Sequence, residues 1–202
     1  MNAKISPQEF YNKFASDYDS TLRGAQVNAQ YVKEAVNLFQ KYHRGMNGSI
    51  LDLGCGTGIL KDLLEGTFDY TGIDVSENML YHAQKRGYKT VHRSIEEALP
   101  EIPDLSYDFV IAIGSLLFVE DFNLCLKHIH RISCQSILLS LDTLTKDYID
   151  GFGVPVFNHS KISIPEAQDD FLIRGWTSPS TGVTIKTRVI YISKNHIASS
   201  SP

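Results

Sequence analysis

The sequence predicts an α/β fold, namely a doubly wound, mostly parallel sheet with helices on both faces, an N-terminal helical lid and a C-terminal antiparallel hairpin. Between residues 50 and 141, short and almost wholly apolar segments alternate with helical ones. Continuous apolar strands are typical of a parallel sheet that is covered on both faces. After residue 143 the pattern changes to two strands of alternating polarity. With 202 residues and 43% hydrophobic side chains, the chain suits one domain with a sizeable core.

Two helices are expected before the first strand. Ser6 is placed to cap the first helix, and Pro7 suits its first turn. Aromatic side chains follow at helical spacing, at Phe10, Tyr11, Phe14 and Tyr18. A second helix is predicted over 25–42, and the glycines at 45 and 48 end it.

The central part of the chain then predicts a regular alternation of elements. Strands are expected at 50–54, 70–74, 88–92, 109–115 and 136–141, and helices at 59–64, 76–86 and 121–132. Two prolines within 99–103 predict a loop or short turn there.

The C-terminal part gives a weaker signal. Residues 145–169 show no convincing periodicity, whereas 170–178 and 183–193 alternate in polarity and predict a hairpin joined by a turn at 178–182. This hairpin either supplies the sixth and seventh strands of the sheet, which we favour, or belongs to a substrate cover. The tail at 198–202 is expected to be disordered.

Composition excludes several classes of partner. The net charge of −4 and the absence of a Lys/Arg cluster argue against a nucleic-acid partner. No apolar run approaches the roughly 20 residues of a membrane span, and the first residues lack the apolar core of a signal peptide. The three cysteines form no C-x-x-C pair, which favours a reducing cytosol without disulfides or a zinc site.

The most informative motif is Ile-Leu-Asp-Leu-Gly-Cys-Gly-Thr-Gly at 50–58. A strand that ends in a glycine loop and continues as a helix is typical of nucleotide sites in open α/β sheets. The dinucleotide pattern G-x-G-x-x-G requires a third glycine at position 59, where Ile59 stands. Asp52, just before the loop, favours a cationic ligand over a pyrophosphate. Asp74 closes the next predicted strand at about the 20-residue separation from which an acid reaches a ribose diol.

These motifs resemble those of class I S-adenosylmethionine-dependent methyltransferases. The glycine loop is similar to their first motif and residues 70–80 to their second, while 107–115 resembles their fourth segment. Tyr-Asn-Lys-Phe-Ala-Ser-Asp-Tyr-Asp at 11–19 is similar to the lid helix of the small-molecule members. The family's usual Gly-Asp at the end of the third strand is replaced here by Arg93-Ser94.

The resemblance implies S-adenosylmethionine as cofactor, with S-adenosylhomocysteine as product. By the same resemblance Asp74 binds the ribose, Val75 and Met79 lie against the adenine, and Tyr18 reaches the methionine carboxylate. Its implied cofactor-binding residues are Tyr11, Tyr18, Asp52, Gly54, Cys55, Gly56, Gly58, Asp74, Val75, Met79, Ser94, Ile95, Ile113, Gly114 and Ser115. The lid is expected at 1–45, the cofactor-binding core at 49–142, and a substrate cover with the hairpin at 143–195.

The expected activity is transfer of a methyl group to O or N of a small molecule by in-line displacement, without a metal, in the cytoplasm. The Asn/Asp-Pro-Pro-aromatic signature of enzymes that methylate base amino groups is absent. His159 and Tyr148 are candidates for a general base, and Arg174 and Trp176 for substrate contacts. Two other readings stay open: a non-catalytic S-adenosylmethionine-binding regulator or partner subunit, and a nicotinamide oxidoreductase, which Ile59 disfavours. The acceptor and the oligomeric state are left undetermined.

Overall fold

A computed structural model describes residues 4–20, 26–177 and 184–194. Within these residues seven strands form one sheet in the order β3-β2-β1-β4-β5-β7-β6. β7 is antiparallel to both of its neighbours, and the other pairs are parallel. The hairpin therefore completes the sheet, as favoured from the sequence. The strands are β1 (Asn47–Leu53), β2 (Thr67–Asp74), β3 (Lys89–His92), β4 (Tyr107–Ala112), β5 (Ser133–Thr143), β6 (Asp169–Thr177) and β7 (Thr184–Ser193).

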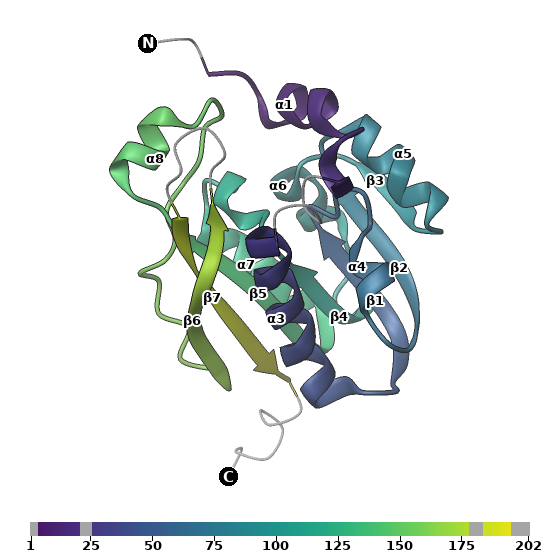
Figure 1. Ribbon diagram of the computed structural model, residues 1–202. Helices are drawn as coiled ribbons and strands as arrows, with labels where there is room; N and C mark the ends of the chain where they lie inside the picture. Colours follow the sequence, from purple (N-terminus) through teal and green to yellow (C-terminus); the bar gives the residue numbers. More distant parts are fainter. Residues whose placement is uncertain (1–3, 21–25, 178–183, 195–202) are drawn as a thin grey trace.

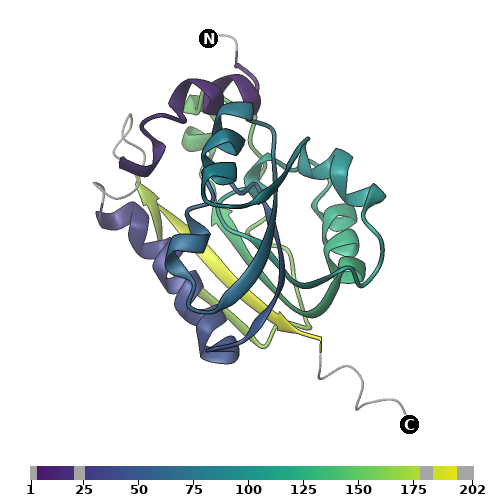
Figure 2. The same ribbon diagram turned by 90° about the vertical axis from the view of Figure 1, so that its right-hand side faces the viewer.

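Helices cover both faces of this sheet (Figures 1 and 2). Successive strand residues point to opposite faces, so Ile50 packs with one apolar cluster and Leu51 with the other. Helices α3 (Gln26–His43), α4 (Leu60–Leu63) and α5 (Glu77–Lys85) cover the Ile50 face. Helices α6 (Ile95–Ala98) and α7 (Phe122–Ile132) cover the opposite one. The predicted doubly wound architecture is confirmed.

Side-chain caps fix where the helices begin. Ser6 accepts from the Glu9 amide at the start of α1 (Pro7–Phe14), and Ser76 accepts from the Met79 amide at the start of α5. Asp121 caps α7 by accepting from Leu124. Each cap satisfies an amide that has no partner within its helix.

Several elements differ from the sequence prediction, among them the short helix α6, which was not expected. The fourth strand ends at Ala112 rather than at 115, because the chain turns at Gly114, whose φ is +71°. Within 145–169, where no helix was expected, Thr145 caps a short helix, α8 (Lys146–Gly151). Its six residues are too few to reveal a period, and Tyr148 is the buried one. Two 3₁₀ turns, η1 (Leu99–Glu101) and η2 (Leu116–Phe118), complete the described elements.

The predicted tail at 198–202 and the predicted turn at 178–182 lie outside the described residues. No helix in the described part of the chain is long and apolar enough to cross a membrane.

Candidate functional site

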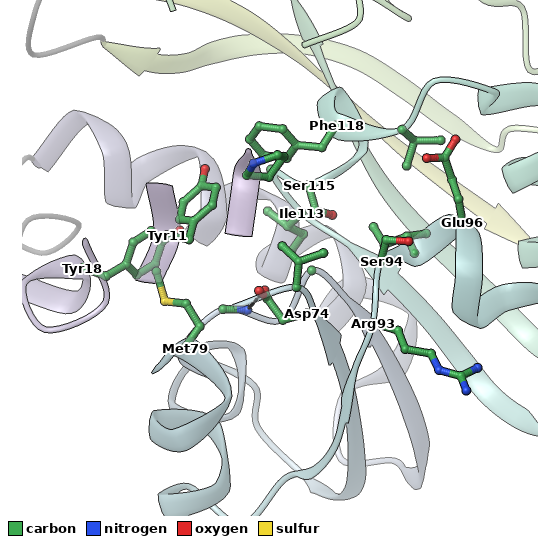
Figure 3. Close-up of a pocket in the computed structure, with 17 residues that line it drawn as sticks. Tyr11, Tyr18, Asp74, Met79, Arg93, Ser94, Glu96, Ile113, Ser115 and Phe118 are labelled. Carbon is green, nitrogen blue, oxygen red and sulfur yellow. Dashed lines mark hydrogen bonds between the residues drawn. The ribbon is translucent and has the colours of Figure 1, made fainter. Parts of the chain in front are cut away.

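A pocket lies at the carboxyl edge of the parallel strands, under the lid helix α1 (Figure 3). In open α/β sheets this edge is where ligands bind. Most of the cofactor-binding residues implied by the resemblance come together there. The described lining consists of Pro7, Tyr11, Tyr18, Gly54, Gly56, Asp74, Val75, Met79, Arg93, Ser94, Ile95, Glu96, Ile113, Gly114, Ser115, Phe118 and Val119.

The glycine loop is held against β2 by its own backbone. The amides of Gly54 and Cys55 both donate to the carbonyl of Ile73, at 2.8 and 3.1 Å. Gly54 has a φ of +70°, and a Cβ there would lie 2.3 Å from Cβ of Ser115. Only glycine fits, because any side chain would meet both a disfavoured backbone conformation and a neighbouring atom.

Asp74 lies on the pocket wall with both carboxylate oxygens already oriented. Oδ2 accepts from the Gly56 amide at 2.9 Å, and Oδ1 accepts from the Ser76 amide at 2.8 Å. Burial raises the pKa of Asp74, and these backbone hydrogen bonds act in the opposite direction. Each oxygen keeps a lone pair that can accept from a ligand hydroxyl.

Hydrogen bonds hold the lid at two places, the start of α5 and the glycine loop. Asn12 Oδ1 accepts from the Ser76 hydroxyl at 2.7 Å and from the Asn78 amide at 3.3 Å, which docks α1 on the start of α5. Asp19 accepts from the Thr57 hydroxyl at 2.6 Å, and it also forms an ion pair with Arg86.

Arg86 completes this fastening by donating to the carbonyl of Thr57 and to the Asp62 carboxylate. Between the two points the ring of Tyr18 lies over the loop, 3.9 Å from where a Cβ of Gly56 would be. Neither Asn12 nor Arg86 was singled out from the sequence, because their partners Ser76 and Asp19 are distant in the chain.

Three of the implied cofactor residues, Asp52, Cys55 and Gly58, are not among the described residues that line the pocket. Asp52 is buried on the same face as Ile50 and accepts from the Tyr88 hydroxyl at 3.0 Å. Burial raises the pKa of Asp52 to about 7. Cys55 packs closely on Gly72, since a Cβ added to Gly72 would lie 2.4 Å from the Sγ of Cys55. Gly58 lies against the Tyr88 ring. Asp52 and the Tyr88 ring thus support the loop from the side opposite the pocket.

The end of the third strand carries the departure from the family pattern. Ser94 lines the pocket and also caps α6, accepting from the Glu97 amide at 3.2 Å. Arg93 points away from the centre of the pocket (Figure 3), where its guanidinium pairs with Glu101. The described pocket therefore holds carboxylates, while the basic side chain at its edge is turned outward.

The candidates for a general base and for substrate contacts lie in different parts of the structure. Tyr148 is buried on α8 near the pocket, as described below. His159 does not line the pocket, because its Nε2 lies 2.7 Å from the Val119 carbonyl and its ring stacks on Phe122 at 5.0 Å. The backbone of Arg174 and Trp176 belongs to β6, but their side chains lie outside the described residues.

Phe118 and Val119, which follow the fourth strand, line the pocket without having been singled out from the sequence. Phe118 contacts Tyr11 of the lid, with ring centroids 5.6 Å apart. The sequence could have indicated these two residues only by their position, a few residues after the turn at Gly114.

Comparison with known proteins agrees with this geometry. The strand order and the loop define the fold of class I methyltransferases, and residues 51–136 match a family model described as a methyltransferase domain. A crystal structure of magnesium protoporphyrin IX methyltransferase from Synechocystis, with bound S-adenosylhomocysteine, superposes with a TM-score of 0.65 at 18% identity, covering 92% of this chain and 96% of that one. The chain thus has the fold of class I S-adenosylmethionine-dependent methyltransferases, and its residues 51–136 are similar to a methyltransferase domain.

The relatives found by sequence are longer than this chain. A malonyl-[acyl-carrier protein] O-methyltransferase of Bacillus cereus is 26% identical over 200 residues, which cover 96% of this chain and 70% of the relative. An uncharacterized protein of Haemophilus influenzae is 28% identical over 150 residues, covering 69% of this chain and 58% of the relative. The chain therefore spans little more than half of the length of one of these relatives.

Proposed function

We propose that the protein transfers the methyl group of S-adenosylmethionine to a small-molecule acceptor, at nitrogen or oxygen. The observation that carries this proposal is Asp74, whose two oxygens are fixed by backbone amides of the glycine loop and of α5 at the wall of the pocket. An acid held in this way suits the two hydroxyls of a ribose.

The charges of the pocket favour this cofactor over a dinucleotide. Asp74 and Glu96 line it, and Arg93 is turned outward to Glu101. A pyrophosphate would have to lie among carboxylates, whereas a sulfonium and an ammonium are attracted by them. Met79 and Ile95 supply apolar surface for an adenine, and Tyr18 over Gly56 covers the methionine end.

These residues act by binding and orienting. S-adenosylmethionine supplies an activated methyl group when bound, and the protein has to hold the acceptor atom in line with it and exclude water. Such orientation contributes up to about 7–11 kcal/mol in well-aligned reactions. The lid, fastened through Asn12 and Asp19, closes the pocket from above.

Calorimetry with S-adenosylmethionine, S-adenosylhomocysteine and NAD tests the proposal. We expect both adenosyl ligands to bind with 1:1 stoichiometry and NAD not to bind. Transfer of a labelled methyl group to members of a metabolite panel then separates an enzyme from a non-catalytic binding protein. Absence of binding by either adenosyl ligand, or binding without any transfer, contradicts the proposal.

A further inference from the structure

A second cavity, of about 320 Å³, adjoins the candidate cofactor pocket. Its volume lies within the range of small-molecule sites, roughly 300–1,000 Å³. Tyr11, Tyr18 and Gly114 line both cavities, so the two cavities share a border at these residues. Half of the other described lining residues are aromatic, namely Phe10, Phe14, Tyr31, Tyr148 and Phe152.

Among the described residues that line this cavity, Asp142 is the charged one. It lies near the end of β5, at the same edge of the sheet as the glycine loop, and it pairs in register with Thr187 of β7. Its Oδ1 accepts from the Thr187 hydroxyl at 2.6 Å. Its Oδ2 accepts no hydrogen bond from any described residue, and none of the described residues that line the cavity is basic.

The groups that face Asp142 from the surrounding elements are neutral near pH 7. They are Tyr11 of α1, Tyr31 of α3 and Tyr148 of α8, and burial raises the pKa of each phenol. Burial also raises the pKa of Asp142, to about 6, while the hydrogen bond from Thr187 lowers it. Asp142 is therefore ionised at neutral pH and close to the range in which a carboxylate works best as a proton acceptor.

We propose that this second cavity binds the methyl acceptor, that the acceptor is an amine, and that Asp142 binds its ammonium group and removes the proton. The inference rests on the proposed function. A lone carboxylate among aromatic faces stabilises a cation through ion pairing and cation–π contacts. An acceptor that carries a carboxylate or phosphate would meet the charge of Asp142 with no described basic side chain to offset it.

The reaction balances with these groups. The ammonium gives one proton to Asp142, and repulsion from the positive sulfonium lowers the pKa of the ammonium. The nitrogen lone pair forms the new C–N bond while the C–S bond breaks, and sulfur keeps the electron pair of that bond. The products are a methylammonium, a neutral thioether and a protonated Asp142, which releases its proton to water.

A matched set of acceptors tests the chemical class. Labelled methyl transfer is measured with 2-phenylethylamine and a panel of other primary amines, and with the corresponding alcohols and carboxylates. We expect transfer to one or more amines, and at least tenfold lower kcat/KM with the matched alcohol and carboxylate. Equal or faster transfer to alcohols or carboxylates, or no transfer to any amine of the panel, overturns the inference.

Two variants test the role of Asp142. Asp142→Asn should lower kcat/KM for the amine at least 100-fold and leave the affinity for S-adenosylhomocysteine within twofold. Thr187→Val removes the hydrogen bond that lowers the pKa of Asp142, so the acid limb of the kcat/KM profile should move to higher pH. Asp150→Asn, an exposed carboxylate on α8 that pairs with Lys146, is the matched control and should change neither quantity.

The outcomes separate this inference from the proposed function. If the wild-type protein binds S-adenosylhomocysteine but Asp142→Asn keeps the full rate and Thr187→Val leaves the pH profile in place, the role of Asp142 is wrong and the cofactor assignment stands. If the wild-type protein does not bind S-adenosylhomocysteine, the proposed function itself fails.

Discussion

The two adjoining cavities are built in different ways. The candidate cofactor pocket is shaped largely by backbone, since the glycine loop bonds back to Ile73 and two main-chain amides orient Asp74. The second cavity is shaped by side chains from α1, α3, β5, α8 and β7, which are far apart in the sequence. A site made by a local backbone turn leaves a motif in the sequence, whereas one assembled from distant rings leaves none.

Asp52 and Asp142, two aspartates with raised pKa values, show the same contrast. Asp52 is sealed beneath the glycine loop with the Tyr88 hydroxyl as its partner, and Asp142 opens into a cavity with the Thr187 hydroxyl as its partner. Burial raises the pKa of both, to about 7 and about 6. The first has no described route to a ligand and supports the loop, while the second has a free oxygen at a site.

The largest effect is expected from Gly54→Val. A Cβ at this position would lie 2.3 Å from Ser115, at a φ of +70°, so the loop has to shift. We expect a loss of about 3 kcal/mol or more in the free energy of unfolding, roughly 6–12 °C in Tm. Binding of S-adenosylhomocysteine, measured by calorimetry, should disappear.

The control for this change is Gly151→Val, on the wall of the second cavity, where no atom lies within 4 Å of the added Cβ. It should leave cofactor affinity unchanged. If Gly54→Val binds S-adenosylhomocysteine as the wild-type protein does, the backbone does not shape the first pocket in the way described.

Asp52→Asn is expected to change stability rather than binding. The pKa of Asp52 is near 7 when folded, against 3.8 in a model peptide, so the folded state holds more protons between these values. The free energy of unfolding therefore falls as pH rises from about 4 to 7 and stays low above that range. Asn keeps an oxygen for the Tyr88 hydroxyl and removes this dependence.

We expect Asp52→Asn to be more stable than wild type at pH 8 by about 2–4 kcal/mol, and nearly equal to it at pH 4. Urea unfolding at the two pH values measures this difference. Asp69→Asn, exposed near the start of β2, is the control with no pH-dependent gain. A gain for Asp52→Asn that is the same at both pH values would contradict the buried-carboxylate explanation.

Asp74→Asn should weaken binding of S-adenosylhomocysteine by roughly 10–100-fold. An amide has one acceptor oxygen, so its NH₂ group would face the amide of either Gly56 or Ser76. Calorimetry measures the change. The control is Glu96→Gln. One oxygen of Glu96, Oε1, accepts from the backbone amides of both Glu120 and Asp121. Gln can keep both bonds, so the affinity for S-adenosylhomocysteine should fall less than about threefold. An equal loss in both variants would mean that Asp74 has no special role.

Arg86→Leu is expected to give the smallest effect. It removes the ion pair that fastens Asp19 to the glycine loop, and the side chain is only 19% exposed. We expect dissociation of S-adenosylhomocysteine, measured by stopped flow, to be about 3–10-fold faster. Lys13→Leu breaks an exposed ion pair with Glu9 on the same lid and should leave the rate unchanged. Equal rates for Arg86→Leu and wild type would show that the lid does not depend on this fastening.

The sequence predicted the strand alternation, the cap at Ser6, the helices over 76–86 and 121–132, and the position of the glycine loop, because each depends on residues close together in the chain. The resemblance implied Asp52 as a cofactor-binding residue, because the motif shows that this acid is close to the glycine loop. The motif does not show which face of β1 the side chain occupies, and Asp52 is buried outside the described pocket lining. It missed α8, which is too short to show a period. It also missed Asp142, whose significance depends on Thr187 and on rings contributed by distant elements.

Tyr11 and Tyr18 belong to the walls of both cavities, and this has a thermodynamic consequence. A ligand that moves either ring on one side changes the surface that the other ligand meets. Occupancy of the two cavities is then linked, and linkage is reciprocal: the factor by which the cofactor changes affinity for the acceptor equals the factor by which the acceptor changes affinity for the cofactor. Through these two rings of the lid, ligand binding in one cavity is coupled to ligand binding in the other.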